Sequence, residues 1–247
     1  MFDLLVSFFN IVLYQPLFNA LILLYQYLPG HDFGIAVIVL TTLIRVALYP
    51  LASQGIRSQK ALSSLQPKLK EIQEKFKDNR EGLAKAMMEL YQKEKINPFS
   101  GCLPSLIQMP ILLALFLVLK TLSNGLEAGE LQMLYSFVSY SDHINTMFLG
   151  LIDLTTASMP LAILTGVVQY YQMKMVMPSK PLFQKGNSKT PDFSQMMQKQ
   201  MLYFLPAFTV LILYQLPSAI ALYWSFSTLF TIFQQYTILN FGKGKIK

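Results

Sequence analysis

The sequence predicts an all-α membrane protein whose helices cross the bilayer several times. Three observations support this prediction. Two of them are compositional: 53% of the 247 residues are apolar, and the mean hydropathy is +0.41. The third is that these apolar residues form near-continuous runs rather than stripes along one helix face. A soluble protein of this size would show mainly amphipathic stripes, so the pattern argues against that class.

The basic residues predict which loops lie in the cytoplasm. The chain has 20 Lys and Arg and a net charge of +7, but none of these residues lies between Thr121 and Tyr171. Loops rich in Lys and Arg stay on the cytoplasmic side of a membrane. We therefore expect three cytoplasmic segments, 55–98, 177–199 and 241–247, and one extracytoplasmic segment, 123–156.

Five crossings satisfy this charge distribution. Lys120 is the exception, because it lies at an outer helix end, from which its long side chain can reach the headgroups. The C-terminus is then cytoplasmic. The predicted transmembrane helices are 30–54, 99–122, 157–176, 200–216 and 217–240.

Residues 1–29 are predicted to form an interfacial helix on the outer face. They are apolar enough to span, but they lack the basic start and the small-residue cleavage site of a signal peptide. Narrow polar faces before and after Pro16 favour a helix that lies flat in the interface. A sixth crossing is the alternative, since no basic residue precedes Arg45.

The cytoplasmic segment 55–98 has the pattern of a helical hairpin. Its apolar residues recur at helical spacing on both sides of a polar turn at 77–82, and Pro67 should kink or restart the first helix. The apolar stripe is about as wide as one helix needs to pack on the other, which fits a structural hairpin. The alternative is a docking or moving element at the membrane surface.

The sequence offers little material for catalysis or metal binding. Its one cysteine, Cys102, excludes an internal disulfide and a cysteine metal cluster, and the two histidines are too few for a histidine centre. No phosphate-binding glycine loop, zinc-binding HExxH or serine elbow is present. We therefore expect neither an enzyme nor a bound cofactor or metal. The loop 177–199 has no recognisable chemistry.

Arg45 is the most informative residue, because it lies inside an apolar segment of spanning length, Phe33 to Ala52. It is about 18 Å along a helix from Phe33. A charge at such a depth costs at least about 2.5 kcal/mol to insert, so it should face a wet cavity rather than lipid. The alternative is that it reaches the cytoplasmic interface. Its predicted polar stripe consists of Thr41, Thr42, Arg45, Tyr49 and Ser53.

Other predicted helices carry polar residues that could form a hydrophilic groove with Arg45. On each helix these residues are spaced so that they share a face. The alternative is that individual Gln, Ser or Thr residues only join helices, at about 0.6 kcal/mol per hydrogen bond. The candidates are Gln108, Gln169, Gln172, Tyr223, Trp224, Ser227 and Thr231.

Several motifs in this sequence resemble the YidC/Oxa1/Alb3 family of membrane-protein insertases. The run Asn97-Pro98-Phe99-Ser100-Gly101-Cys102-Leu103-Pro104, continued by Gln108-Met109-Pro110, is long and specific. The other matching segments are Thr42 to Leu51, Leu65 to Lys68, Met88 to Tyr91, Leu216 to Ser218 and Ala221 to Trp224. The resemblance extends along nearly the whole chain.

The resemblance implies five helices around a groove that opens to cytoplasm and lipid and is closed on the outer side. It implies an insertase and chaperone in the bacterial plasma membrane, with nascent membrane proteins and the lipid bilayer as partners. The ribosome and a Sec-type translocon are further candidate partners, and direct nucleic-acid binding is not expected. The tail 241–247 is shorter than the long basic tails by which some relatives bind ribosomes.

A hydrophilic groove would lower the cost of moving a polar segment into the membrane. Each unsatisfied backbone group in lipid costs several kcal/mol, and a groove offers such groups temporary partners. Two other classes remain open: a channel or small-solute transporter, and a membrane-embedded hydrolase. The outer halves of the spans have few polar residues to continue a channel, and a hydrolase would need a convincing base.

Overall fold

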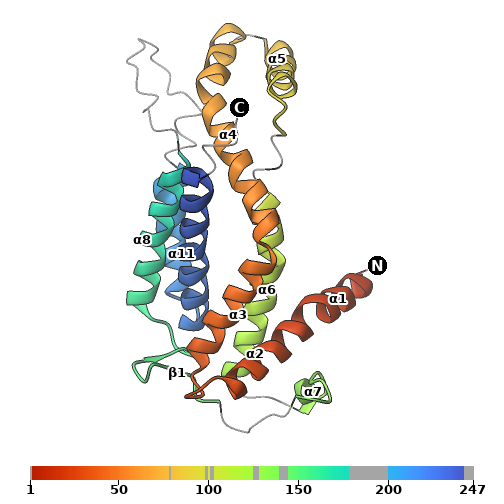
Figure 1. Ribbon diagram of the computed structural model, residues 1–247, viewed down its shortest axis with the longest axis vertical. Helices are drawn as coiled ribbons and strands as arrows, with labels where there is room; N and C mark the ends of the chain where they lie inside the picture. Colours follow the sequence, from red (N-terminus) through yellow and green to blue (C-terminus); the bar gives the residue numbers. More distant parts are fainter. Residues whose placement is uncertain are drawn as a thin grey trace.

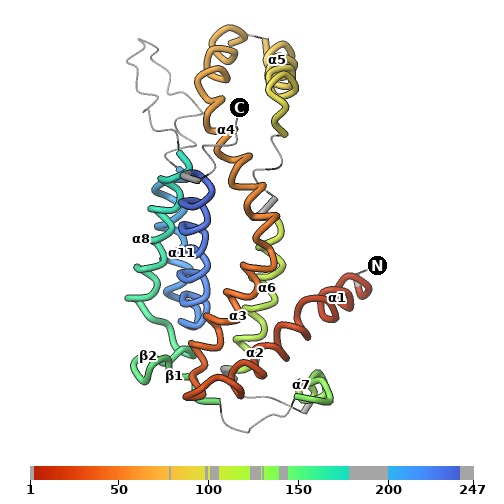
Figure 2. Tube along the Cα trace, in the orientation of Figure 1, coloured from red at the N-terminus to blue at the C-terminus, as the bar shows by residue number. Residues whose placement is uncertain are grey.

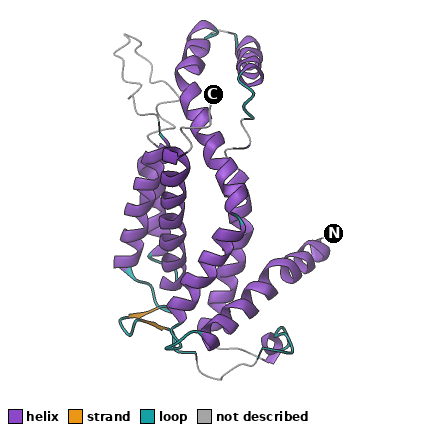
Figure 3. Ribbon diagram, in the orientation of Figure 1, coloured by secondary structure: helices purple, strands orange, loops and turns teal. Residues whose placement is uncertain are grey.

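The computed structural model describes residues 2–77, 79–97, 100, 103–124, 128–138, 144–177 and 200–241. Helices make up most of this chain, as expected for an all-α membrane protein (Figure 3). Cys102, the tail beyond Phe241 and all but the first residue of the predicted loop 177–199 lie outside the described residues. The helices are α1 (Phe2–Phe9), η1 (Asn10–Tyr14), α2 (Gln15–Tyr27), α3 (Phe33–Ala47), α4 (Tyr49–Lys75), α5 (Arg80–Lys93), α6 (Leu103–Asn124), α7 (Ala128–Leu131), α8 (Met159–Val176), η3 (Gln200–Phe204), α10 (Leu205–Leu213) and α11 (Ser218–Phe241).

The bundle is built around α11, which packs against α8 on one side and α3 on the other (Figure 1). Helix α10 packs on α8, and α2 packs on both α3 and α6. The helices α1 and α2 form an arm that runs obliquely to the bundle. The buried apolar side chains of the core include Phe18, Leu21, Phe33, Leu119 and Ala221, from α2, α3, α6 and α11.

The helix around Arg45 is bent, whereas the spacing of its polar residues in the sequence had been interpreted as one straight helix. Asp32 caps α3 by accepting a hydrogen bond from the Ile35 amide at 3.0 Å. The helix ends at Ala47, and α4 begins at Tyr49 with its axis bent by 70°. Pro50 explains the break, because proline lacks an amide hydrogen and its ring clashes with the carbonyl one turn earlier. The first turn of α4 tolerates this proline.

The predicted hairpin is formed by the far part of α4 and by α5. Helix α4 continues through Pro67 without a restart. Helix α5 begins after Asn79, whose side chain accepts a hydrogen bond from the Gly82 amide at 2.8 Å. It lies beside the end of α4 (Figure 1) and has no buried residue. The contact between the two helices is therefore thin.

One helical stretch among the described residues, Asp3–Tyr27, is long and apolar enough to cross a membrane, and α3 with α4 would be a second if the bent pair is one span. Two shorter apolar helices are Leu106–Leu122 and Gln200–Leu213. Side chains at the start of the long stretch, such as Leu4 and Leu5, are exposed, at 73% and 60%. The five crossings and the flat orientation of residues 1–29 stay predictions.

The polar face of α2 contacts protein. Asn19 is 1% exposed and donates to the Met133 carbonyl at 3.0 Å, while its oxygen accepts from the Tyr135 amide at 2.8 Å. Gln15 also donates to the Met133 carbonyl. This face of α2 therefore holds the segment after α7. These contacts explain why α2 carries polar residues there, without reference to its orientation in a membrane.

A two-stranded antiparallel sheet, which the sequence analysis did not predict, lies within 123–156. Strands β1 (Met147–Phe148) and β2 (Ile152–Asp153) sit at the end of the bundle where α3 and α8 begin (Figure 2). The turn between them has positive φ at Leu149 and Gly150, and Asp32 accepts a bond from the Leu149 amide at 2.6 Å. These contacts fix the turn between β1 and β2 in place.

The Thr155 amide and hydroxyl both donate hydrogen bonds to the Asp153 carboxylate, and these bonds hold the pKa of that carboxylate below its ordinary value.

Candidate functional site

Arg45 is half-buried in the last turn of α3 and reaches across to α11. Its Nε donates a hydrogen bond to Ser227 Oγ at 3.0 Å, and its Nη2 donates to the same oxygen. Within the described part of the chain, the ion pair that the structure shows joins Lys68 and Glu94. Arg45 thus has a neutral hydroxyl, but no carboxylate, as a partner among those residues.

Two further predicted residues join this pair. Tyr223 lies one turn before Ser227 on α11 and is 3% exposed. Gln108, from α6, donates a hydrogen bond through Nε2 to the Tyr223 hydroxyl. We call Arg45, Ser227, Tyr223 and Gln108 the Arg45 cluster. It connects three helices, and the sequence analysis had named all four residues.

The predicted threonines take a different role. Thr41 and Thr42 donate to the Val37 and Ile38 carbonyls of their own helix, at 2.6 and 2.9 Å. Thr231 donates in the same way to the Ser227 carbonyl at 3.0 Å. Their hydroxyl hydrogens are therefore used locally, and only the oxygen lone pairs remain for another group.

The 70° bend separates Tyr49 from the predicted stripe. This residue begins α4, and its side chain is 41% exposed. A straight helix would have placed it one turn beyond Arg45 on the same face. The spacing behind the stripe from Thr41 to Ser53 assumed one continuous helix, whereas the helix breaks before Pro50. A place for Tyr49 in a groove with Arg45 stays a prediction.

The remaining candidates lie on α8 and α11. Gln169 is buried, at 6% exposed, and its Oε1 has no hydrogen-bond partner among the residues that the structure describes. Gln172 is half-buried one turn further along α8, and Trp224 is half-buried against the apolar core. The structure brings none of these three into the hydrogen bonds of the Arg45 cluster.

A polar contact between α8 and α11 involves two residues that were not predicted from the sequence. The hydroxyls of Thr165 and Ser225 lie 2.6 Å apart, and both side chains are buried. Gly166, next in sequence, lets α10 approach, since a Cβ there would lie 2.4 Å from Val210 Cγ2. A small residue beside a threonine in an apolar helix is typical of close helix packing in membranes, and was the available signal.

The chemistry of this site favours binding over reaction. Arginine keeps its charge at any physiological pH, so Arg45 can attract an anion but cannot act as a general base. The other three side chains of the cluster are neutral hydrogen-bonding groups. Among the residues that the structure describes, no three His, Cys, Asp or Glu side chains lie together as metal ligands would.

Comparison with known proteins gives a consistent result. The chain is similar to proteins named membrane protein insertase YidC from three bacteria. The Geobacter metallireducens protein is 33% identical over 224 residues, covering 91% of this chain and 36% of that protein. The Fusobacterium nucleatum protein is 34% identical over 211 residues, covering 85% and 88%. The Francisella tularensis subsp. novicida protein is 34% identical over 207 residues, covering 84% and 32%.

The chain spans about a third of the length of the Geobacter and Francisella relatives, and most of the length of the Fusobacterium one. A family model described as the 60Kd inner membrane protein matches residues 23–245, which include every residue of the Arg45 cluster. The family resemblance predicted from the sequence motifs is thereby confirmed. The chain belongs to the 60Kd inner membrane protein family.

Proposed function

We propose that this protein is an insertase and chaperone that guides nascent membrane-protein segments from the cytoplasm into the bilayer. The observation that carries the proposal is Arg45. It is a charged group in an apolar helix, bonded to Ser227 of α11 and without a carboxylate partner among the described residues. The names of its relatives support the same activity.

The physical reason lies in the cost of burying charge. Removing a charge from water is costly unless a partner compensates it, so an arginine bonded only to a hydroxyl is incompletely compensated. An acidic residue in an incoming segment would complete the compensation. Arg45 would therefore attract such a segment, after which the apolar part of the substrate could leave sideways into lipid.

A hydrophilic groove among five transmembrane helices is the arrangement that we propose for this step. In addition to the Arg45 cluster, its walls would include Gln169, Gln172 and Trp224. The half-buried state of Gln172 and Trp224 and the unpaired Oε1 of Gln169 support their place there. Thr41, Thr42, Thr231 and Tyr49 would contribute oxygen atoms at its edges.

The proposed topology has the hairpin and the C-terminus in the cytoplasm, and the segment 123–156 outside. Single cysteines in a Cys102→Ser background test it with a membrane-impermeant thiol reagent. Position 130 should react in intact cells, and positions 80, 187 and 245 only after lysis. Reaction of position 80 in intact cells would contradict the topology.

The proposed partners follow from this topology. The bilayer and nascent membrane proteins are the primary ones, and the bacterial plasma membrane is the proposed location. The ribosome and a Sec-type translocon are proposed as further partners, with the basic hairpin α4–α5 as the part that would meet them first. The two alternatives for this hairpin, a structural element or a docking element, are both compatible with its thin packing.

Substitution of Arg45 tests the proposed mechanism. In liposomes containing the purified protein, Arg45→Ala should reduce insertion of a single-span substrate with an acidic outer segment by roughly tenfold, the factor for 1.4 kcal/mol. Arg45→Lys should retain most of the activity, because lysine keeps the positive charge. The measurement is protease protection of the inserted segment.

A substrate whose outer acidic residues are replaced by glutamine is the matched control, and should depend less on Arg45. Equal, full insertion with Ala and with Lys would show that the charge has no part in the mechanism. Loss of the folded protein in both variants would make Arg45 a structural residue. Flux of small solutes through the same liposomes would instead support a channel.

A further inference from the structure

The first turn of α3 is attached to the strand hairpin, by which we mean residues 146–156 with β1 and β2. Asp32 divides its carboxylate between two amides: Oδ1 accepts from Ile35 and caps α3, and Oδ2 accepts from Leu149 in the turn of the hairpin. Gly34 packs directly on Phe148 of β1, since a Cβ at position 34 would overlap the phenylalanine ring. A larger residue there would therefore push the strand hairpin away from α3.

The first turn of α11 is attached to the same strand hairpin by three hydrogen bonds. Ser218 Oγ donates to the Asp153 carbonyl at 2.9 Å, and the Ser218 amide donates to the Thr156 carbonyl at 2.8 Å. The Ala219 amide donates to the Leu154 carbonyl at 3.1 Å. The first amides of a helix have no partner within that helix, so the strand hairpin satisfies two of them. Ser218 and Leu154 are both 0% exposed.

The strand hairpin between these two attachments is fixed in shape. Its strands pair in antiparallel register, and the Leu151 amide closes the turn by donating to the Phe148 carbonyl at 2.9 Å. Leu149 has a φ of 52°, which a residue with a side chain adopts at a cost. Such a conformation persists where neighbouring groups hold it, and the bond to Asp32 does so here. The strand hairpin therefore joins the beginnings of α3 and α11 at a set separation.

The two helices joined in this way carry the Arg45 cluster. Arg45 lies 13 residues after Asp32, and Ser227 lies nine residues after Ser218, which is about 20 Å and about 14 Å along the two helices. Both helices begin at the strand hairpin and run away from it in the same direction (Figure 1). Helices joined at one end separate by pivoting about that end, so any opening between them is widest far from the strand hairpin.

We propose that the strand hairpin is a clamp that keeps α3 and α11 together at this end throughout insertion, so that the bundle opens only at the other end. The proposal rests on the insertase function and adds a permeability barrier to it. In the proposed topology the clamped end is the outer one. A passage open at both ends would admit ions as well as substrate, and the clamp prevents this. Asp32 and Gly34 are its positioning residues on α3.

Two variants weaken the clamp on its α3 side. Asp32→Asn replaces one acceptor oxygen by an NH2 group, so either the Ile35 or the Leu149 amide loses its acceptor. Liposomes containing the purified full chain are loaded with potassium and given a single-span substrate. Potassium efflux during insertion should rise about tenfold, the factor for one lost hydrogen bond to a charged group, while the yield of inserted substrate stays near that of the wild type.

Gly34→Ala should raise potassium efflux in the same assay, because its Cβ displaces the ring of Phe148. The matched control is Gly129→Ala in α7. A Cβ at position 129 would meet no atom within 4 Å, so this variant should have the efflux and the insertion yield of the wild type.

A disulfide across the clamp separates the proposed role from a general loss of stability. A Cβ on Gly34 would lie 2.9 Å from Phe148 Cβ, and disulfide-linked Cβ atoms lie about 3.5–4.5 Å apart, so a small shift allows the bond. Gly34→Cys with Phe148→Cys is therefore made in a Cys102→Ser background. The oxidised protein should insert substrate normally without potassium efflux, and the reduced protein should insert substrate with efflux.

Loss of insertion on oxidation, restored by a reductant, would show that this end must open, and would overturn the inference. Wild-type efflux in Asp32→Asn, Gly34→Ala and the reduced cysteine pair would overturn it as well. If the first two variants fail to fold, the cysteine pair decides, because its two states are compared in one polypeptide. Failure of the wild-type protein to insert substrate would instead refute the insertase function, which potassium efflux does not measure.

Discussion

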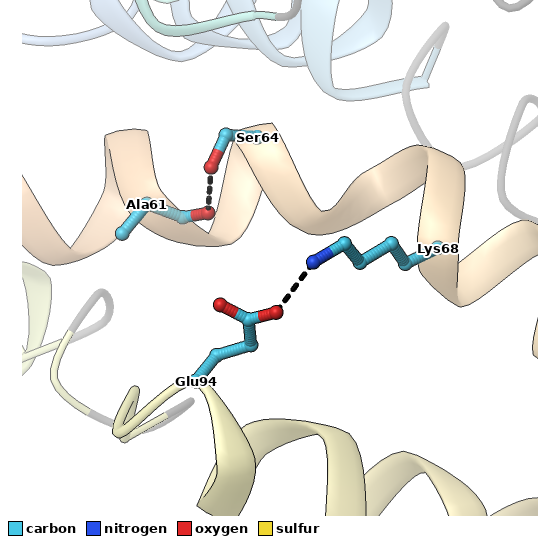
Figure 4. Close-up of polar contacts among 4 residues, drawn as sticks. All are labelled: Ala61, Ser64, Lys68 and Glu94. Atoms are coloured by element: carbon cyan, nitrogen blue, oxygen red, sulfur yellow. Dashed lines mark hydrogen bonds and ion pairs between the residues drawn. The ribbon is translucent and has the colours of Figure 1, made fainter.

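The helical core and the hairpin formed by the far part of α4 and by α5 are held together by different interactions. In the core, Phe18, Leu21 and Leu119 are at most 1% exposed, and they come from helices packed closely on one another. In the hairpin, α5 has no buried residue. Its visible link to α4 is an ion pair at 2.5 Å between Lys68 and Glu94, side chains that are 56% and 31% exposed (Figure 4).

The difference implies a gradient of local stability along the long axis of the molecule. Regions with few buried contacts open at a lower free energy than the global one. The hairpin should therefore open and move while the core stays folded. The proposed insertase function would use this division, since the hairpin could yield to an incoming chain without loss of the helix packing that holds Arg45.

Cavity formation in the core should have the largest effect. Phe18 is fully buried between α2 and its neighbours, and Phe18→Ala should lower the free energy of unfolding by about 3–5 kcal/mol. Denaturant unfolding in detergent measures it. The control is Leu4→Ala, at a side chain that is 73% exposed, and it should change stability little. Similar losses in both variants would contradict the assignment of the core.

Removing a polar contact inside the bundle should have an intermediate effect. Thr165 and Ser225 join α8 and α11 through hydroxyls 2.6 Å apart. A double-mutant cycle with Thr165→Val and Ser225→Ala should give a coupling of about 0.6 kcal/mol, which is typical between membrane helices. A coupling near zero would mean that each hydroxyl is satisfied by its own helix alone, as Thr165 partly is through the Leu161 carbonyl.

Acidification should have the smallest effect, and it should be confined to the hairpin. The hydrogen bond from Lys68 and its charge hold the pKa of Glu94 below the ordinary value of 4.5. A lowered folded-state pKa stabilises at pH values above the ordinary pKa, and this contribution is lost as the pH falls through the lowered value. Amide exchange in α5, relative to unfolded-peptide rates, should therefore change only below about pH 4.5.

The matched control for this prediction is Lys68→Met, which should remove the pH dependence and leave exchange in the core helices unaltered. If exchange in α5 of the wild type were as slow as in α11 at neutral pH, the hairpin would be as stable as the core. The proposed gradient would then be wrong.

The sequence by itself determined the helical membrane class and the family, and it placed the four residues of the Arg45 cluster within a larger set of groove candidates. Composition and motif spacing are local properties, and they do not depend on how helices rotate against one another. The hairpin was also predictable, because its apolar spacing and the turn at 77–82 are encoded within one segment.

Only the tertiary structure decided which polar residues meet. The chain bends by 70° between α3 and α4, so Tyr49 does not continue the helix of Arg45. A partner on another helix distinguished Gln108, which is bonded to Tyr223, from Gln234 and Gln235, whose side-chain amides have none within the described part of the chain. All three are glutamines in apolar helices and look alike in sequence. Whether a buried amide is satisfied depends on the rotation and depth of the neighbouring helix, which sequence spacing within one helix does not contain.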